Sequence, residues 1–577
     1  MRTTVTGGAK TPRTAHDRLR IAAALVMSGA LVLAQCPAIA YADEGGGSQG
    51  QASGGAPPDM PSGQGGSGGG ANTMAFDYSG TYSGAKTADG QDVSSSDEAI
   101  DATTAGQNTA LAQNGGTLDL SGDTLTKSGD DSDSDTCNFY GANSIVLAVG
   151  DKSTAYLTDC QLSASSAGSN GLFSTDRATL YSQGGTISTT ADNSRGLDAT
   201  YGGSIVADDL DVSTQGGHSA SVATDRGGGD VSLTDSTIST AGDGSPLLYS
   251  TGDIEVSGVT GTASDSQICA MEGLNTILVN DSTLESTHDG TSGSDPMADG
   301  IIIYQSTSGD AASTTGEAAT FCATGSTLKS AITSGSMFYL TNTTADIVLK
   351  GTTIDFDSSA ANLLTAEGND SNSWGTAGSN GATVNFTGIG ETLAGTISAD
   401  TISTANVYLL KGTTWTGATS ITQNAAGSTS KAPITVNVDG SSTWVVTADS
   451  TVSNLNVASG GAIVDEDGNT VSIVVNGETL VQGTGSTTVT VTGSYSASVS
   501  TGSANEVTSC SIDRSGFDEH YGTSTTFEMG SGTAATTQAA TTTQTPATAA
   551  TTTSTEAGTG SWWDGVVSWF QGLFGLS

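Results

Sequence analysis

Gly-Leu-Phe-Ser-Thr (171–175) returns three times in altered form, as Gly-Leu-Asp-Ala-Thr (196–200), Ser-Val-Ala-Thr-Asp (221–225) and Leu-Leu-Tyr-Ser-Thr (247–251). One apolar position of this pattern forms a column with members 25 residues apart: Leu172, Leu197, Val222 and Leu247. A fixed period of this length is typical of a repeat architecture, in which each unit packs on the next.

A second apolar column supports the same repeat. Its members, spaced by 25, 25 and 26 residues, are Leu162, Ile187, Val212 and Ile238. Elsewhere in each unit, apolar and polar residues alternate in short runs such as Asp-Val-Ser-Leu (230–233), which is strand periodicity. Three short strands with their turns fill such a unit, and units of this kind stack at roughly 4.8 Å. We therefore predict an all-β fold, a right-handed parallel β-helix.

The composition agrees with a narrow core and an acidic surface. Aromatic residues are 5 % of the chain, and Gly contributes 79 residues of 577. A solenoid needs few large side chains because its core is one column deep. Lys plus Arg is 16 against 59 for Asp plus Glu, so the net charge is −43. Such a surface repels polyanions, and we expect no nucleic-acid partner.

Composition divides the chain into six parts. We predict a signal peptide (1–42), a Gly/Ser-rich linker (43–75), a β-helix with regular coils (76–380), a C-terminal β-helical or β-rich region (381–530), a Thr/Ala-rich disordered stalk (531–560) and an aromatic tail (561–577). The first part has a basic start, an apolar run and small residues suited to cleavage. The protein is therefore expected to be secreted, either extracellular or associated with the cell surface.

Three local features of the β-helix can also be predicted. Ala99–Gln113 is expected to form a short helix that caps the open end, where unpaired strand edges would otherwise promote aggregation. Leu284, Leu328 and Ile354 should continue one apolar column. The insertions Thr287–Gly300 and Ser306–Gly316 should form loops that leave the coil.

The tail is predicted to form a short amphipathic helix. Its aromatic residues on a broad face include Trp562, Trp563, Trp569, Phe570 and Phe574. The segment is too short to span a bilayer. It would contact a membrane interface, the cell envelope or a partner, and docking on the β-helix of the same chain is the alternative.

Three Gly-containing segments resemble those of a known family: Cys137–Asn143, Ser194–Gly203 and Ala223–Gly229. Over about 76–500, the chain resembles secreted right-handed β-helix proteins of Gram-positive bacteria, usually described as adhesin-like or uncharacterised. Trp444–Val471 is similar to the closing coils of pertactin-like autotransporter passenger domains. The resemblance implies the architecture and an extracellular location, and it carries no catalytic residues.

Two groups of residues are candidates for ligand binding. Arg195 and Arg226 are rare cations that stand close in sequence to Asp198 and Asp225. They would either bind an acidic glycan or another anion, or pair with these carboxylates between coils. Oxygen ligands suit calcium, so the second group is a calcium loop or a solvated acidic loop: Asp131, Asp133 and Asp135. Apart from calcium we expect no cofactor.

Catalytic residues are not apparent. Asp208 and Asp209 lie about ten residues from His218, less than half a coil, so the three cannot face one another from neighbouring coils. We therefore expect no enzymatic activity. The predicted function is adhesin-like binding of glycans or of host or matrix proteins. The alternatives are a polysaccharide-active enzyme, pectate-lyase-like or a glycoside hydrolase, and a passive surface-coat protein.

Overall fold

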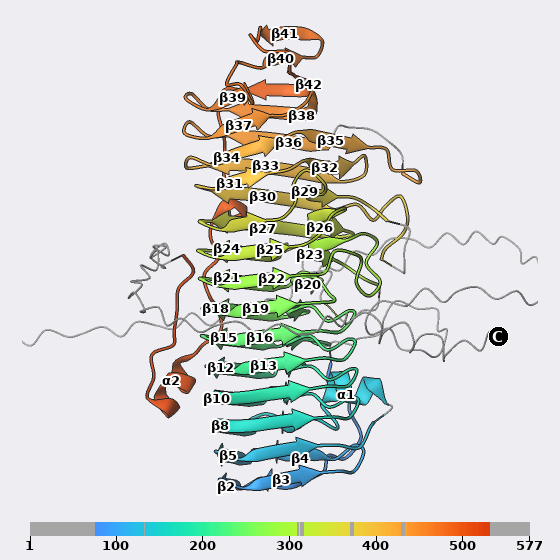
Figure 1. Ribbon diagram of the computed structural model, residues 1–577, viewed down its shortest axis with the longest axis vertical. Helices are drawn as coiled ribbons and strands as arrows, with labels where there is room; N and C mark the ends of the chain where they lie inside the picture. Colours follow the sequence, from blue (N-terminus) through green and yellow to red (C-terminus); the bar gives the residue numbers. More distant parts are fainter. Residues whose placement is uncertain are drawn as a thin grey trace, which may run out of the picture. The chain divides into compact units, whose positions relative to one another are not determined.

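The structure is a computed structural model that describes residues 75–530 except 132, 308–310, 312–316, 370–373 and 428–432. The predicted signal peptide, most of the linker, the stalk and the aromatic tail lie outside the described residues. Within them, short strands stack coil upon coil as a parallel β-helix, which confirms the predicted fold class (Figure 1). Each coil places its strands on three faces. No helix in the described ranges is long and apolar enough to cross a membrane.

One face is sheet A, which is parallel throughout and has 13 strands. Its strands, in spatial order, are β1 (Gly84–Asp89), β4 (Asn108–Gln113), β7 (Val146–Val149), β9 (Leu172–Thr175), β11 (Leu197–Ala199), β14 (Val222–Thr224), β17 (Leu248–Ser250), β20 (Cys269–Glu272), β23 (Asp299–Tyr304), β26 (Ser336–Thr341), β29 (Asn362–Ala366), β32 (Ile397–Asp400) and β35 (Thr419–Thr422).

Two further ladders of parallel strands complete the regular coils. Ladder B1 contains β2 (Asp92–Ser96), β5 (Thr117–Ser121), β8 (Thr154–Ala164), β10 (Thr179–Thr189), β12 (Ser204–Asp208), β15 (Asp230–Thr234), β18 (Asp253–Ser257), β21 (Thr276–Asn280), β24 (Ala319–Thr324), β27 (Thr344–Lys350), β30 (Thr383–Ile389), β33 (Thr404–Leu410), β36 (Ile434–Val438), β38 (Ser450–Val457) and β42 (Thr488–Ser496). Ladder B2 contains β3 (Ala99–Ala102), β6 (Thr124–Lys127), the second halves of β8 and β10, β13 (Asp211–Thr214), β16 (Thr237–Thr240), β19 (Thr260–Ala263), β22 (Thr283–Ser286), β25 (Thr327–Ser330) and β28 (Thr353–Asp355).

The last coils replace ladder B2 with sheet C. Its strands are β31 (Thr392–Ala394), β34 (Thr414–Gly417), β37 (Thr443–Val446) and β39 (Ala462–Asp465). Trp415 and Trp444 stack in its core with ring centroids 4.9 Å apart. Beyond them β40 (Ser472–Val475) pairs antiparallel with β41 (Glu478–Val481), so the parallel stack ends in a hairpin.

The strand register confirms the second apolar column in full. Leu162, Ile187, Val212 and Ile238 are paired neighbours on ladder B2, and all four are buried. Further along the same ladder Leu284 pairs with Leu328, and Leu328 with Ile354, as predicted.

The first apolar column is right at three positions and wrong at the fourth. Leu172, Leu197 and Val222 pair in order on sheet A, but Val222 pairs with Leu248 and not with Leu247. This coil is one residue longer, as the spacing of 26 in the other column indicates. Leu247 and Leu248 are both completely buried, so hydrophobicity alone could not separate them.

The predicted capping helix at Ala99–Gln113 is wrong. This segment forms β3 and β4, which pair with β6 on ladder B2 and with β1 and β7 on sheet A. The alternation of exposed and buried side chains in β3 explains why pairing overrides the helical propensity of its Ala residues. The described helices are α1 (Ser134–Tyr140), a single 3-10 turn η1 (Ser503–Asn505) and α2 (Ser515–Tyr521).

The last described residues, 497–530, form no coil, and we call them the strap. The strap runs back across the outer face of ladder B1 toward the N-terminal coils, where α2 lies beside the early strands (Figure 1). Its successive anchors are Asn505 Nδ2 to Thr387 Oγ1 at 2.9 Å, Ser511 N to Glu255 Oε1 at 2.5 Å, Arg514 Nη1 to Ser232 O at 3.0 Å and Tyr521 OH to Leu157 O at 2.8 Å. It then turns and returns to β24, where Gly530 N donates to Thr324 Oγ1 at 3.0 Å.

The two insertions lie on either side of β23. Thr287–Gly300 leaves the coil between β22 and β23 as predicted, except that its last two residues belong to β23. Most of Ser306–Gly316 lies outside the described residues, so its loop stays a prediction. The loop that follows β29 also covers sheet A, because its Trp374 is buried and stacks on Tyr304 with ring centroids 4.6 Å apart. Loops therefore wall the outer face of this sheet.

Candidate functional site

The structure brings three of the four predicted ligand-binding residues together in a buried ion-pair group. Arg195 Nη1 lies 2.8 Å from Asp198 Oδ2, and Arg195 Nη2 lies 2.8 Å from Asp225 Oδ2. The three side chains are at most 3 % exposed. A ligand outside the coil cannot reach them in this conformation. The ion pairs join β11 to the next coil, which is the alternative that the sequence analysis left open.

Arg226 is separate from this group. Its guanidinium carbon lies 3.6 Å from the centre of the Phe139 ring, a cation–π contact with α1. Tyr140 of the same helix stacks on Tyr201, with ring centroids 5.5 Å apart. These contacts hold α1 on sheet A and leave Arg226 only partly exposed.

The acidic run before α1 serves the start of that helix. Asp133 Oδ1 accepts a hydrogen bond from Thr136 N at 3.1 Å, the usual N-cap arrangement. Asp131 Oδ1 accepts from Asp133 N at 3.0 Å. Among the described residues no three His, Cys, Asp or Glu side chains lie together as a metal group. Calcium binding by Asp131, Asp133 and Asp135 stays a prediction.

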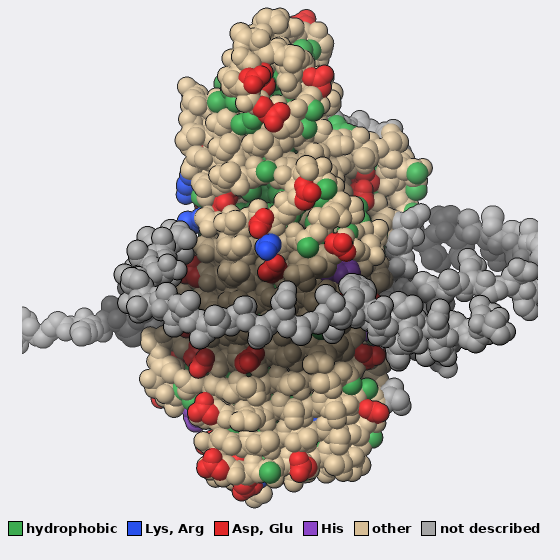
Figure 2. All heavy atoms as spheres, viewed as in Figure 1, with side chains coloured by type: hydrophobic (Ala, Val, Ile, Leu, Met, Phe, Trp, Pro, Cys, Tyr) green, Lys and Arg blue, Asp and Glu red, His purple; other side chains and the backbone are tan. Residues whose placement is uncertain are grey.

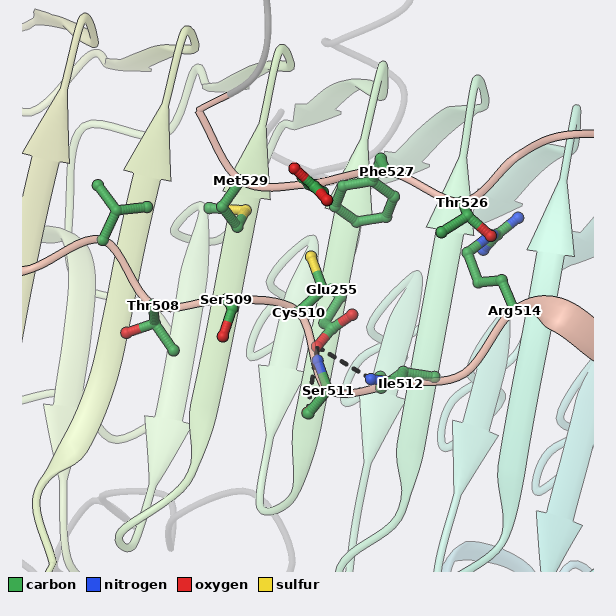
Figure 3. A pocket seen from close by; sticks show the side chains of 12 residues that line it. Glu255, Thr508, Ser509, Cys510, Ser511, Ile512, Arg514, Thr526, Phe527 and Met529 are labelled. Atoms are coloured by element: carbon green, nitrogen blue, oxygen red, sulfur yellow. Dashed lines mark hydrogen bonds between the residues drawn. The ribbon is translucent and has the colours of Figure 1, made fainter. Parts of the chain in front are cut away.

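A cavity of about 550 Å³ lies between the two limbs of the strap (Figure 3). Cys510 and Met529 are among the side chains that line it, one from each limb. Its charged floor is Glu255, which accepts hydrogen bonds from Ser511 N and Ile512 N at 2.5 and 3.3 Å. The carboxylate is therefore committed to holding the strap, and we do not place the functional site here.

The outer face of sheet A offers a different arrangement at the C-terminal ends of its strands. There the repeat position of Thr200 and Asp225 recurs on later coils as Glu272, Glu367 and Asp400. Outward-pointing carboxylates thus gather along one edge of the sheet, next to the loops that wall it. Two further cavities with polar linings lie along this edge.

A cavity of about 330 Å³ surrounds Glu367 and Asp400. The other lining residues come from the segments 368–369, 377–378 and 422–426. Asp400 is 2 % exposed, and three N–H groups donate to its carboxylate: Gly368 N at 3.0 Å, Ile402 N at 3.2 Å and Asn424 Nδ2 at 2.8 Å. Burial, and next the charge of Asp400, raise the pKa of Glu367 to about 7.

A second cavity of about 300 Å³ lies on the other side of the loop that follows β29. Gln305, Glu317, Asn342 and Thr343 are among its lining residues, which also include Gly381 of that loop. Both cavities are at the small end of the range for ligand pockets, about 300–1,000 Å³. Together they form an amide- and hydroxyl-lined edge with acidic groups.

This site was not among those predicted from the sequence. Its only signal was the position of Glu367 and Asp400, each one residue past a buried Ala in the strand pattern. That position is visible once the coils are aligned, but the irregular lengths of the later coils hid the alignment. The walls come from loops, which no periodic pattern describes.

Ladder B2 presents a flat face of hydroxyl groups. Its strands begin with an outward residue that is Thr on most coils, and the Thr residues are Thr124, Thr186, Thr237, Thr260, Thr283, Thr327 and Thr353. The second outward position is Ser163, Ser188, Ser213 and Ser239 on four consecutive coils. Parallel register repeats these hydroxyls at roughly 4.8 Å. The sequence analysis did not single out this face by residue.

Comparison of the chain with known proteins gives no matching family model, no matching curated protein and no matching solved structure. The fold and the geometry of its surfaces are therefore the basis for a functional assignment.

Proposed function

We propose that this protein is a secreted or surface-associated, adhesin-like β-helix that binds extended glycans along the C-terminal edge of sheet A. The observation that carries the proposal is the pair of cavities lined by Asn, Gln, Thr and Glu side chains on one edge of the sheet. A few convergent polar groups in a concave site are what ligand orientation requires. The hydroxyl face of ladder B2 supplies a second, flat surface for a repetitive ligand.

The charges favour a neutral or basic glycan. Acidic side chains are scattered over the face shown in Figure 2, with few Lys or Arg among them. The net charge of −43 opposes an anionic polysaccharide. Of the two cations considered for an acidic glycan, Arg195 is buried in ion pairs and Arg226 packs over the Phe139 ring. A glycan ligand also agrees better with the cavities than a broad protein interface does, because each cavity is small.

A glycoside hydrolase site is the second candidate function for the same cavity. That chemistry uses two carboxyl groups that both reach the glycosidic bond. Asp400 is buried under three N–H donors, so only Glu367 is available to a ligand. Binding without cleavage therefore accounts better for the cavity. Release of new reducing ends from a bound polysaccharide would favour the hydrolase.

The proposal is tested by a glycan-array screen of the full chain with and without calcium. Ala425 is exposed at the rim of the Glu367 cavity, and a Trp there would fill it. We expect Ala425→Trp to abolish binding of a glycan that the array identifies. The control is Ala331→Trp, since Ala331 is exposed after β25, away from both cavities. Equal loss in both variants, or none in either, would contradict the placement of the site.

The tail completes the proposal for surface attachment. Trp562, Trp563, Trp569, Phe570 and Phe574 lie outside the described residues, so membrane, envelope or partner contact stays a prediction. Deleting 561–577 should release the protein from cells and leave the unfolding transition unchanged. Retained cell association with a lowered melting temperature would show that the tail docks on the β-helix instead.

A further inference from the structure

The carboxylate of Glu367 is a hydrogen-bond acceptor that the described part of the chain leaves unsatisfied. It follows β29, and the register of Ala366 with Ala399 places it beside Asp400 on the next strand, roughly 4.8 Å away along the stack. Asp400 receives three hydrogen bonds. No described residue donates a hydrogen bond to the carboxylate of Glu367. Of the two carboxylates in the cavity, one is satisfied and the other is open.

The groups that face Glu367 provide no compensating charge. Asp400 approaches from β32 and the phenol of Tyr339 from β26. None of the lining residues is Lys, Arg or His. Two neighbouring carboxylates repel each other, and partial burial weakens the screening by water. A positive group in the cavity would offset both the repulsion between the two carboxylates and the loss of screening by water.

An independent observation shows the same shortage of donors. Asn380 Oδ1 is buried without a hydrogen-bond partner, and the residue is 1 % exposed. It lies 2.7 Å from the place that a Cβ on Gly368 would occupy, which puts it behind this lining residue of the cavity. The amide nitrogen of Asn380 is already used, donating to Trp374 O at 2.8 Å. The acceptor that is open to the cavity is therefore the Glu367 carboxylate, and the unsatisfied Asn380 carbonyl lies buried behind the lining residue Gly368.

We propose that the Glu367 cavity binds a primary ammonium group carried by an amino sugar of the glycan. The inference rests on the proposed glycan-binding function and names the sugar that this cavity selects. An ammonium group has three donors and no acceptor, so it matches a site with free acceptors and a negative charge. A divalent metal is a poorer match because the described residues around Glu367 include no third ligand of the His, Cys, Asp or Glu type.

The test compares two glucose tetramers that differ in one group. In one tetramer a terminal 6-hydroxyl is replaced by an amine, whose ammonium form persists through pH 8 as that of a lysine side chain does. Calorimetry at pH 8 should show at least tenfold tighter binding of the aminated tetramer to the full chain. The preference should shrink at pH 5.5, because Glu367, with a pKa of about 7, is then protonated and uncharged.

Glu367→Gln is the decisive variant. It should abolish the preference at pH 8, so that the two tetramers bind the variant equally. Glu285→Gln is the control for the loss of one negative charge, since Glu285 pairs with Lys329 on ladder B2. Equal binding of the two tetramers, or a preference that survives Glu367→Gln, would overturn the ammonium site.

Butylamine separates this inference from the proposed function. If neither tetramer binds, binding of glucose chains is excluded, and the amine alone still tests the cavity. Weaker binding of butylamine by Glu367→Gln than by the unaltered chain at pH 8 would then support the ammonium site. Equal binding by both would refute it.

Discussion

Replacement of Arg195 by Met tests whether the predicted ligand group is a structural ion-pair group. The change removes a guanidinium that lies 2.8 Å from both Asp198 and Asp225, and it leaves both carboxylates buried. Breaking a buried pair from one side costs about 3–5 kcal/mol. We expect a loss of this size in the free energy of local unfolding at β11 and β14, because two buried carboxylates lose the same guanidinium at once.

Hydrogen exchange of backbone amides is the suitable measurement. A solenoid unfolds by units, so one global transition need not report a local defect. The amides of β11 and β14 should exchange faster by a factor that corresponds to the loss, while those of sheet C should not change. Arg177→Met is the matched control, since the side chain of Arg177 is 64 % exposed and pairs only with its neighbour Asp176 in the described contacts. We expect less than about 0.5 kcal/mol there.

Measurement at low pH and a compensating variant make the test of Arg195→Met more specific. A buried carboxylate that has lost its cationic partner has a raised pKa. Its destabilising effect is therefore absent below the ordinary Asp pKa of about 4 and grows as the pH rises above that value. The defect of Arg195→Met should therefore be smaller at pH 4 than at pH 7. Adding Asp198→Asn and Asp225→Asn should restore much of the protection at pH 7. Normal protection of β11 in Arg195→Met would refute the reasoning and return Arg195 to the candidates for ligand binding.

Three further changes test the core, the strap and a buried acid. Leu197→Ala removes a completely buried member of the sheet A column and should cost about 2–5 kcal/mol at β9 to β14 by amide exchange, whereas the outward Ser188→Ala should cost almost nothing. Phe517→Ala removes the buried anchor of α2, whose ring centroid lies 4.6 Å from that of Tyr521. The strap should then be the first site of limited proteolysis. Unchanged cleavage would show that other contacts hold the strap. Burial raises the pKa of Glu391 from 4.5 to about 7, so its contribution to stability is complete below pH 4.5 and falls by about 3 kcal/mol as the pH rises to 7. Glu391→Gln, whose amide oxygen can still accept from Thr352 N, should therefore be more stable than the unaltered chain at pH 8 and equally stable at pH 4.5, and equal stability at both would contradict the raised pKa.

The repeat itself could be predicted because the period and the alternation are local properties of the sequence. An apolar residue that recurs once per coil must stack in one column, since each coil can bury its apolar face only against its neighbours. Leu162, Ile187, Val212 and Ile238 follow this rule and pair as expected. The rule fails where two adjacent residues are equally apolar, and only the strand pairing selects Leu248 over Leu247.

Features that depend on contacts between distant parts of the chain could not be predicted from the sequence. Ala99–Gln113 has residues suited to a helix, and its pairing with other coils makes it two strands. The strap was included in the β-rich region because nothing local shows that Arg514 meets Ser232, 282 residues away. Burial is likewise a tertiary property, and it decides between the two predicted roles of Arg195 in favour of pairing with Asp198 and Asp225. The cavity at Glu367 exists only because register sets two carboxylates side by side and loops from separate coils enclose them.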